Sequence, residues 1–483
     1  MTRLWLRATQ VLLILLFFDF QADAVTWVRS DCILTLADGE ETPINGYLKI
    51  SSEGTIVAIE SGDIPDGVTG RFVDAMGKIV MPGFVSGHNH LWQSAFRGLA
   101  SDQELYGWLE SLHWTYGDFF EEDDMYTFTL YGALDQLGHG ITTTLNHTQN
   151  IAPTYAHYLE QFDAEMDAGQ NFVFSYVLDR NEKDPARRKA KLVELMEATE
   201  AIEDQHPCLG FGLHGVGVYF SAEVHREEVA IAKELDLDMQ IHYLEEKDQS
   251  LKKGQSQFAD LHADGGVWDG LVYAHFIHVT DEILKTSAEA GAKMIWNPLS
   301  NGRLASGLAD IPRYLDEGLL IGMGVDGTAS ADVCDPFQNM RMGMYALRMR
   351  DSEASVMSCY EVLRLHTLKT AEVLEVEDRV GSLEVGKYGD FLVVEPESPV
   401  FDPYASLVMA TSAGDISGVW VRGIERVRRG KLTEHSMSKV KKEMVTRVAR
   451  IVAAQKVSAQ MSGGTLSGTS VFPGCFGCCG LGH

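Results

Sequence analysis

The chain has 483 residues, of which 45% are apolar and 23% are charged, so it is long enough for one large domain and a smaller one. Acidic residues outnumber basic ones by 69 to 40, and the formal net charge is −29. This charge disfavours binding to nucleic acids and to anionic membranes, while the composition is ordinary for a folded globular protein. A nucleic-acid partner is therefore excluded from the expected functions.

The start of the chain has the layout of a secretory signal peptide. Arg3 and Arg7 precede an apolar run at 11–18, which is too short to cross a bilayer, and Ala22-Asp23-Ala24 provides a cleavage site between small residues. This layout predicts a mature chain that begins near Val25 and is secreted or enters the secretory pathway. The alternatives are a misassigned start codon and an apolar extension that packs on the next strand, in which case the protein is cytoplasmic.

Eight short apolar segments, each ending in or near Gly, Asn, Asp or His, follow one another through the middle of the chain. Stretches with helical periodicity lie between most of them, as at 124–137, 155–168, 188–203 and 221–235. The expected strands are 78–90, 140–148, 171–179, 208–216, 238–245, 270–278, 292–298 and 319–327. Apolar strands that alternate with helices form a parallel sheet, and eight such units predict an α/β fold with a (β/α)8 TIM-like barrel.

Short strands separated by turns flank this region on both sides. They are expected at 25–36, 46–50 and 55–59, and again at 381–394 and 418–429. Both ends of the chain can therefore build one small β-sandwich domain with the barrel inserted between them. The expected division is a signal peptide at 1–24, an N-terminal half of the β domain at 25–80, the barrel at 81–380, a C-terminal half of the β domain at 381–435, and a helical segment with a disordered Cys- and Gly-rich tail at 436–483.

The carboxyl ends of the strands are where a site is expected, because active sites of parallel barrels lie there. His88 and His90 end the first strand, and strand alternation points both side chains into the barrel mouth, where they can hold one divalent metal ion. His242, near the end of the fifth strand, adds a third nitrogen. Glu245 follows three residues later and is placed to carry a proton from water to a leaving nitrogen, although a surface carboxylate is the alternative.

Other strand ends also carry polar residues. Asp326 follows the eighth strand, where it either serves the site or caps a helix. The sixth strand ends in His275 and His278, whose side chains point in opposite directions, so the spacing alone does not say which of them faces the barrel mouth. His214 ends the fourth strand, where some binuclear barrels have a carboxylated lysine. One metal is therefore expected, and His214 is either a substrate contact or a packed histidine. The second strand ends at Asn146-His147-Thr148, the one glycosylation sequon, which is expected to stay unmodified.

These segments together resemble the amidohydrolase superfamily, in its cytosine deaminase-like branch of triazine hydrolases and S-adenosylhomocysteine/methylthioadenosine deaminases. The resemblance covers residues 25–435. The matching stretches are 81–90, 96–100, 108–110, 140–144, His242 with Glu245, 274–278, 297–307, 324–327, and 381–387 with Asp390. The resemblance implies a metal-dependent hydrolase that attacks a C–N bond other than a peptide bond.

The resemblance also implies roles for individual residues. The ligands of one divalent ion, zinc with iron as the alternative, are His88, His90, His242 and Asp326. Glu245 is the implied proton shuttle, and His275, chosen in this way over His278, orients or deprotonates the water together with Asp326. The expected substrate contacts are His214, Trp92, Arg97 and Asn297.

The resemblance implies hydrolytic deamination of a purine-, pterin- or triazine-like ring. The alternatives are amide or halide hydrolysis at the same site and a non-catalytic secreted binding protein. Nucleoside deaminases of this branch hold the ribose with an acidic residue shortly after the position that matches Trp108, but here Gly117 takes that place, with Asp118 beside it. A flatter heterocycle is therefore favoured, as it also is by Trp92, Trp114 and Tyr116. Besides the small-molecule substrate, the sequence leaves open a homo-oligomer as a second kind of partner.

Overall fold

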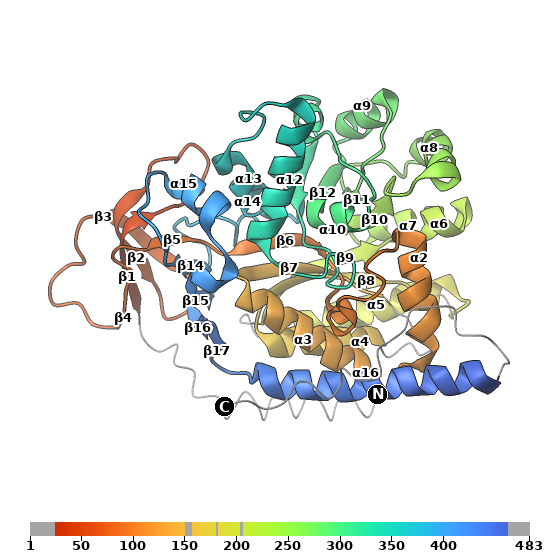
Figure 1. Cartoon of the computed structure of the whole chain (residues 1–483), viewed down its shortest axis with the longest axis horizontal. Coiled ribbons are helices and arrows are strands. Elements are labelled where there is room, and N and C mark those ends of the chain that lie inside the picture. The colour runs from red at the N-terminus through yellow and green to blue at the C-terminus, as the bar shows by residue number, and fades with distance from the viewer. Residues whose placement is uncertain (1–24, 150–156, 180–181, 203–205, 462–483) are drawn as a thin grey trace.

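Two sheets organise the chain, and different segments of the sequence form them (Figure 1). The computed structural model describes residues 25–149, 157–179, 182–202 and 206–461. The expected signal peptide and the Cys- and Gly-rich tail from residue 462 lie outside this range. Among the described helices, none is both long and apolar enough to cross a membrane.

The first sheet is a parallel barrel of eight strands in sequential order. Its strands are β6 (Phe84–Asn89), β7 (Ile141–His147), β8 (Asn171–Val177), β9 (Cys208–His214), β10 (Met239–Tyr243), β11 (Leu271–His275), β12 (Lys293–Trp296) and β13 (Leu320–Met323). The segment after β13 returns to β6, where the backbone N–H of Asp326 donates to the carbonyl of His88 at 3.0 Å. The barrel that the sequence predicts is therefore confirmed.

Helices surround the barrel, and local capping sets where several of them begin. The helices between and after the strands are α3 (Asp124–Gly138), α4 (His157–Ala168), α5 (Pro185–Glu200), α6 (Gly217–Phe220), α7 (Ala222–Glu234), α8 (Asp248–Ala263), α9 (Asp281–Glu289), α10 (Pro298–Arg303), α11 (Ile311–Asp316), α12 (Pro336–Asp351), α13 (Cys359–Leu365) and α14 (Leu368–Val373). Helix α5 begins three residues before position 188, where the sequence pattern predicts its start. Asp184 accepts from the backbone N–H of Ala186, and Pro185 occupies the first helical turn.

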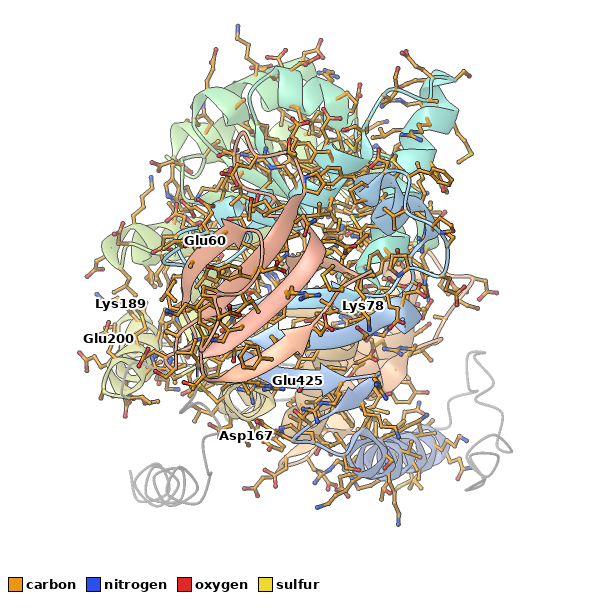
Figure 2. The ribbon with its side chains drawn as sticks, turned by 90° about the vertical axis from the view of Figure 1, so that its left-hand side faces the viewer. Glu60, Lys78, Asp167, Lys189, Glu200 and Glu425 are labelled. Atoms are coloured by element: carbon orange, nitrogen blue, oxygen red, sulfur yellow. The ribbon has the colours of Figure 1, made fainter. Side chains whose placement is uncertain are left out.

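The second sheet has nine strands. They come from both ends of the chain, and this shared origin is what the sequence predicts. They are β1 (Thr26–Ile33), β2 (Ile44–Ile50), β3 (Ile56–Ser61), β4 (Arg71–Asp74), β5 (Ile79–Pro82), β14 (Phe391–Val394), β15 (Ile416–Val421), β16 (Ile424–Arg428) and β17 (Lys431–Leu432). The N-terminal and C-terminal strands join where β14 pairs antiparallel with β5. Figure 2 looks onto this sheet, with Glu60 on β3, Glu425 on β16 and Lys78 just before β5. The Lys78 ammonium lies 2.6 Å from the Glu395 carboxylate.

The first expected barrel strand, 78–90, is two strands that belong to different sheets. The apolar run is continuous because β5 and β6 are both fully buried. The chain passes from one sheet to the other at Gly83, where a Cβ atom would lie 2.0 Å from the Thr142 hydroxyl. Glycine is thus required by close packing at the junction rather than by its backbone conformation.

A segment that follows β6 lies against the C-terminal helix instead of entering the barrel core. It contains η1 (Leu91–Phe96), α2 (Leu105–Leu109), the π-helical turn η2 (Glu110–Trp114) and η3 (Gly117–Phe119). With α3 and α16 (Met437–Met461), which runs along the lower edge in Figure 1, it forms a separate apolar cluster. Arg447 of α16 also contacts the buried carboxylate of Asp124 at 3.1 Å. The C-terminal helix therefore braces the segment after β6.

The small helices α15 (Pro403–Ala405), η4 (Ser406–Ala410) and η5 (Ala413–Asp415) connect β14 to β15. Both strands belong to the second sheet, and between them α15 lies next to α13 and η4 lies next to α12. Because η1 directly follows β6, the segment after β6 starts at the carboxyl end of a barrel strand.

Candidate active site

Five side chains predicted from the sequence meet inside the barrel mouth. They are His88 and His90 from β6, His242 from β10, His275 from the end of β11, and Asp326 from the segment after β13. The side chain of His242 is half-buried and the other four are buried. The ring of His88 lies 4.9 Å from that of His90, 4.8 Å from that of His242 and 5.3 Å from that of His275. The Asp326 Oδ1 atom lies 3.5 Å from Nε2 of both His88 and His90.

Two of these residues sit in backbone conformations that side chains rarely adopt. The φ angles of His275 and Asp326 are +74° and +56°. Such conformations cost of order 1–3 kcal/mol each and persist only where surrounding contacts hold them. Asp326 has these contacts, because its carboxylate accepts from the Ser300 hydroxyl at 2.5 Å and from the backbone N–H of Gly327 at 2.7 Å. The turns direct both side chains into the cluster.

Hydrogen bonds orient the imidazoles of β6. The Nδ1 atom of His88 lies 2.7 Å from Oε1 of Gln240, whose amide nitrogen donates to the Gly87 carbonyl and so fixes the amide orientation. The Nδ1 atom of His90 lies 3.0 Å from the carbonyl oxygen of His147. Since both partners are acceptors, both Nδ1 atoms carry the proton, and the Nε2 atoms present lone pairs to the centre of the cluster.

The free lone pairs fit a divalent metal ion. The Nε2 atoms of His90 and His242 lie 3.3 Å apart, and Nε2 of His88 is buried without a hydrogen-bond partner. Burial, with the nearby His88, lowers the pKa of His90 to about 4, so the imidazole is neutral and able to ligate. Three neutral imidazoles and one carboxylate are a donor set that suits zinc or iron.

Replacement of Gln240 by leucine is expected to weaken metal affinity by ~10–100-fold, because the residue behind a ligating histidine fixes its tautomer and ring orientation. Competition of the purified protein with a chelator measures this affinity. A Gln338→Leu variant serves as the control, since Gln338 bonds Asp335 at the start of α12. Equal affinities for both variants would show that His88 is oriented without Gln240.

Glu245 is a buried carboxyl group next to this cluster. Its Oε1 accepts from the Ser306 hydroxyl at 3.1 Å, and its Oε2 lies 3.5 Å from Nε2 of His275. Burial raises the pKa of Glu245 well above its ordinary value, and the charges of Asp326 and Glu246 add to the shift. A carboxyl group with a raised pKa can both accept and donate a proton near neutral pH.

His275 lies in the cluster, whereas His278 does not. The Nδ1 atom of His275 lies 2.8 Å from the Asn301 side-chain nitrogen, which donates to it, so that Nε2 carries the proton and faces Glu245. His278 instead bonds the backbone carbonyl of Ser306 at 2.7 Å. The two histidines therefore differ in position as strand alternation requires.

The expected substrate contacts divide into two groups. His214 lies 6.3 Å from His242, ring to ring, and Asn297 is buried with its side-chain oxygen unpaired. Trp92 is buried and donates to the Gln149 side chain at 3.1 Å. Arg97 instead forms an ion pair with Asp135 of α3, so its contacts give no support to a role in binding substrate.

The aromatic and acidic residues expected after Trp108 are placed differently from one another. Tyr116 and Gly117 are buried, whereas Asp118 is exposed and the Trp114 side chain is 66% exposed. The exposed carboxylate of Asp118 therefore does not replace an acidic side chain at the buried position of Gly117. The ring of Trp114 faces solvent. Of the aromatic set, only Trp92 and Tyr116 are inside the protein.

A second group of side chains of types that can ligate a metal lies outside the barrel mouth. Asp135, His139 and Cys334 have ligand atoms within 4.8 Å of one another. The Arg97 guanidinium pairs with the Asp135 carboxylate, and Nδ1 of His139 bonds the Asp135 carbonyl at 2.8 Å. A cationic side chain therefore already neutralises the only carboxylate of this group.

The sequence reasoning missed several residues that the fold brings to the site. His147 and His113 are histidines with unpaired buried nitrogens, and Gln240 and Asn301 bond the imidazoles of His88 and His275. His147 ends β7, so the rule that selected His88 would also have selected it. Gln240 and Asn301 had no such signal, because their roles depend on the rotamers of histidines far away in the sequence.

Comparison with known proteins agrees with this architecture. Residues 79–465 match the model of the amidohydrolase family. The chain is 28% identical over 403 residues to a 5-methylthioadenosine/S-adenosylhomocysteine deaminase of Thermoanaerobacter pseudethanolicus, covering 81% of this chain and 91% of that one. It is also 28% identical over 401 residues to a 5'-deoxyadenosine deaminase of Methanobrevibacter smithii, covering 82% and 88%.

Solved structures share the fold at lower identity. An adenosine deaminase from Xanthomonas campestris with bound zinc superposes with a TM-score of 0.77 at 21% identity, covering 89% of this chain and 98% of that one. A triazine hydrolase from Arthrobacter aurescens gives a TM-score of 0.77 at 23% identity, covering 89% and 99%. The family match spans the barrel with its histidine cluster and some strands of the second sheet, so the chain belongs to the amidohydrolase family.

Proposed function

We propose that this protein is a zinc-dependent hydrolase that removes an amino group from a heterocyclic small molecule. The observation that carries the proposal is the buried cluster in which unprotonated imidazole nitrogens and Asp326 lie beside the buried carboxyl group of Glu245. The names of the deaminases at 28% identity support an amino group as the leaving group. Zinc is chosen over iron because a related fold was solved with zinc bound.

The residues of the cluster divide the work. His88, His90, His242 and Asp326 would hold the ion, which supplies a Lewis acid that makes water a nucleophile at neutral pH. Glu245 takes one proton from the water as its oxygen attacks the ring carbon, and it passes this proton to the ring nitrogen, whose double bond to that carbon opens. The second proton of the water then moves through Glu245 to the amino group that departs. The C–N bond breaks, ammonia leaves, and the carbon keeps the oxygen as a carbonyl group. His275, held by Asn301, orients the attacking water.

The surroundings favour a planar substrate. Trp92 is buried two residues after His90, and its indole ring lies 5.3 Å from the imidazole of His113. The position at which nucleoside deaminases of the resembling branch place an acid is Gly117, and the neighbouring Asp118 is exposed. These features support a purine-, pterin- or triazine-like ring without a bound ribose.

Ammonia release from a panel of heterocycles tests this proposal. Zinc-loaded protein of known metal content is incubated with adenine, guanine, an amino-substituted pteridine, an aminotriazine and adenosine. We expect ammonia and a carbonyl product from at least one free heterocycle, loss of activity with a chelator, and recovery with zinc. Chloride release from a chlorotriazine without any deamination would instead favour halide hydrolysis, and zinc-loaded protein that releases neither product would reject the proposed chemistry.

We also propose, from the sequence pattern alone, that the chain enters the secretory pathway. Sequencing of the native protein is expected to find a mature terminus near Val25, and Met1 or Thr2 at the terminus would contradict this. No glycan is expected on Asn146, because its side chain is fully buried and donates to Glu165 at 2.8 Å.

A further inference from the structure

One histidine inside the barrel mouth has no role in the mechanism above. His147 ends β7, next to β6, and it is fully buried. Its ring lies 4.7 Å from that of His242 and 5.0 Å from that of His88. Neither of its ring nitrogens has a hydrogen-bond partner among the described residues. Unpaired buried polar atoms are costly, and beside a catalytic centre they are available to a bound molecule.

Other contacts hold His147 in place without using these nitrogens. Its backbone carbonyl accepts from His90, and its ring packs on that of His214 with centroids 3.6 Å apart. The adjacent Thr148 donates through its hydroxyl to the Ser175 carbonyl at 2.7 Å. The imidazole is therefore positioned before any ligand binds, which reduces the entropy cost of binding.

A second metal ion is not the partner that this imidazole fits. His147, His214 and His242 have nitrogens within 4.8 Å of one another, but this group contains no carboxylate. The Nε2 atom of His242 faces Nε2 of His90 at 3.3 Å, and Nδ1 of His214 bonds the Thr148 carbonyl at 2.5 Å. A second divalent ion would thus share a ligand with the first and add charge without an acidic group to balance it.

We propose that His147 is a substrate-binding residue, in which one ring nitrogen hydrogen-bonds a ring nitrogen or an exocyclic oxygen of the heterocycle. The inference rests on the proposed deaminase function and adds a requirement on the substrate. The substrate carries a hydrogen-bonding atom on the side that faces β7, where the ring of His147 lies 5.0 Å from that of His88. A neutral imidazole has one donor and one acceptor, so either kind of atom satisfies it.

The test replaces His147 by phenylalanine, which keeps a ring and removes both nitrogens. We expect KM for the active heterocycle to rise by ~10–100-fold with kcat changed by less than ~3-fold, because binding is lost equally in the ground and transition states. Metal content should stay at one ion per chain, and the melting temperature should stay equal or rise, since an unpaired polar group is removed. His147→Gln, which restores a donor and an acceptor, should bring KM back toward the wild-type value.

A matched control separates position from burial. His225 of α7 is also buried with both ring nitrogens unpaired, but it has no ring contact with the histidines of the site among the described residues. His225→Phe should leave KM unchanged. A substrate analogue with carbon in place of the contacted atom should bind the wild type and His147→Phe with equal affinity. Together with the two affinities for the substrate itself, these values complete a double-mutant cycle.

Each other outcome assigns His147 differently. Loss of metal in His147→Phe, or two metal ions per wild-type chain, would make it a ligand. A lower melting temperature with unchanged KM would make it a structural residue. An active wild-type enzyme whose KM is unchanged by the substitution overturns this inference alone, whereas zinc-loaded wild-type protein without ammonia release overturns the proposed function and this inference together.

Discussion

Substitution of Glu245 by glutamine is expected to reduce kcat by at least ~10³-fold while metal and substrate still bind. Glutamine keeps the size of the side chain and its contact with Ser306, but it can neither take nor return a proton. The carboxyl group is buried beside Asp326 and Glu246, which raises its pKa, and it lies 3.5 Å from His275. The same group serves the attack of water and the departure of ammonia, so both steps slow.

The measurement is steady-state kinetics together with metal content for the wild type and the variant. Glu165→Gln is the matched control, since it replaces another buried carboxyl group, which accepts from Asn146 and not from the histidine cluster, and it should change kcat by no more than ~3-fold. Loss of metal in Glu245→Gln would show that Glu245 is a ligand. Activity near that of the wild type would place the proton shuttle elsewhere.

Substitution of His88 by alanine is expected to remove the metal altogether. His88 lies at the centre of the cluster, with Nε2 unpaired in the structure and 3.5 Å from Asp326, and its Nδ1 is held by Gln240. Removing one of four ligands from a site of this kind leaves too few donors, so metal content should fall from about one to below ~0.1 per chain. Ammonia release should fall with it.

Elemental analysis after dialysis measures this loss. His139→Ala is the control, because His139 belongs to the group with Asp135 and Cys334 outside the barrel mouth. Full metal content in His139→Ala and none in His88→Ala is the expected pair of results. The reverse pair would locate the ion in the outer group, and retention by both would require ligands other than those proposed.

The barrel was predictable because apolar strands and helices alternate with clear periods, and the strand ends carry the polar residues. The missed boundary at Gly83 has a physical cause, since β5 and β6 are both buried and the apolar pattern does not change between them. β4 was also missed: it has four residues, all half-buried or exposed, so it lacks a strong hydrophobic pattern.

The site was only partly predictable, for a similar reason. Strand position and alternation select His88, His90 and His242 and make Glu245 and Asp326 candidates, and the family resemblance chooses His275 over His278. Gln240 could not be selected, because its function depends on which tautomer His88 adopts across the barrel. Arg97 matches a family segment, but its guanidinium pairs with Asp135 in a contact that no local pattern indicates.

Anomalous X-ray diffraction at the zinc edge, from crystals of the zinc-loaded protein, tests most directly whether the histidine cluster is the metal centre. The structure predicts one strong peak, bound by His88, His90, His242 and Asp326, with Glu245 near it but not ligating. Zn–N distances of ~2.0–2.1 Å are expected. A peak at Asp135, His139 and Cys334 instead, a second peak beside His147, or no peak in the barrel mouth would contradict this assignment of the metal centre.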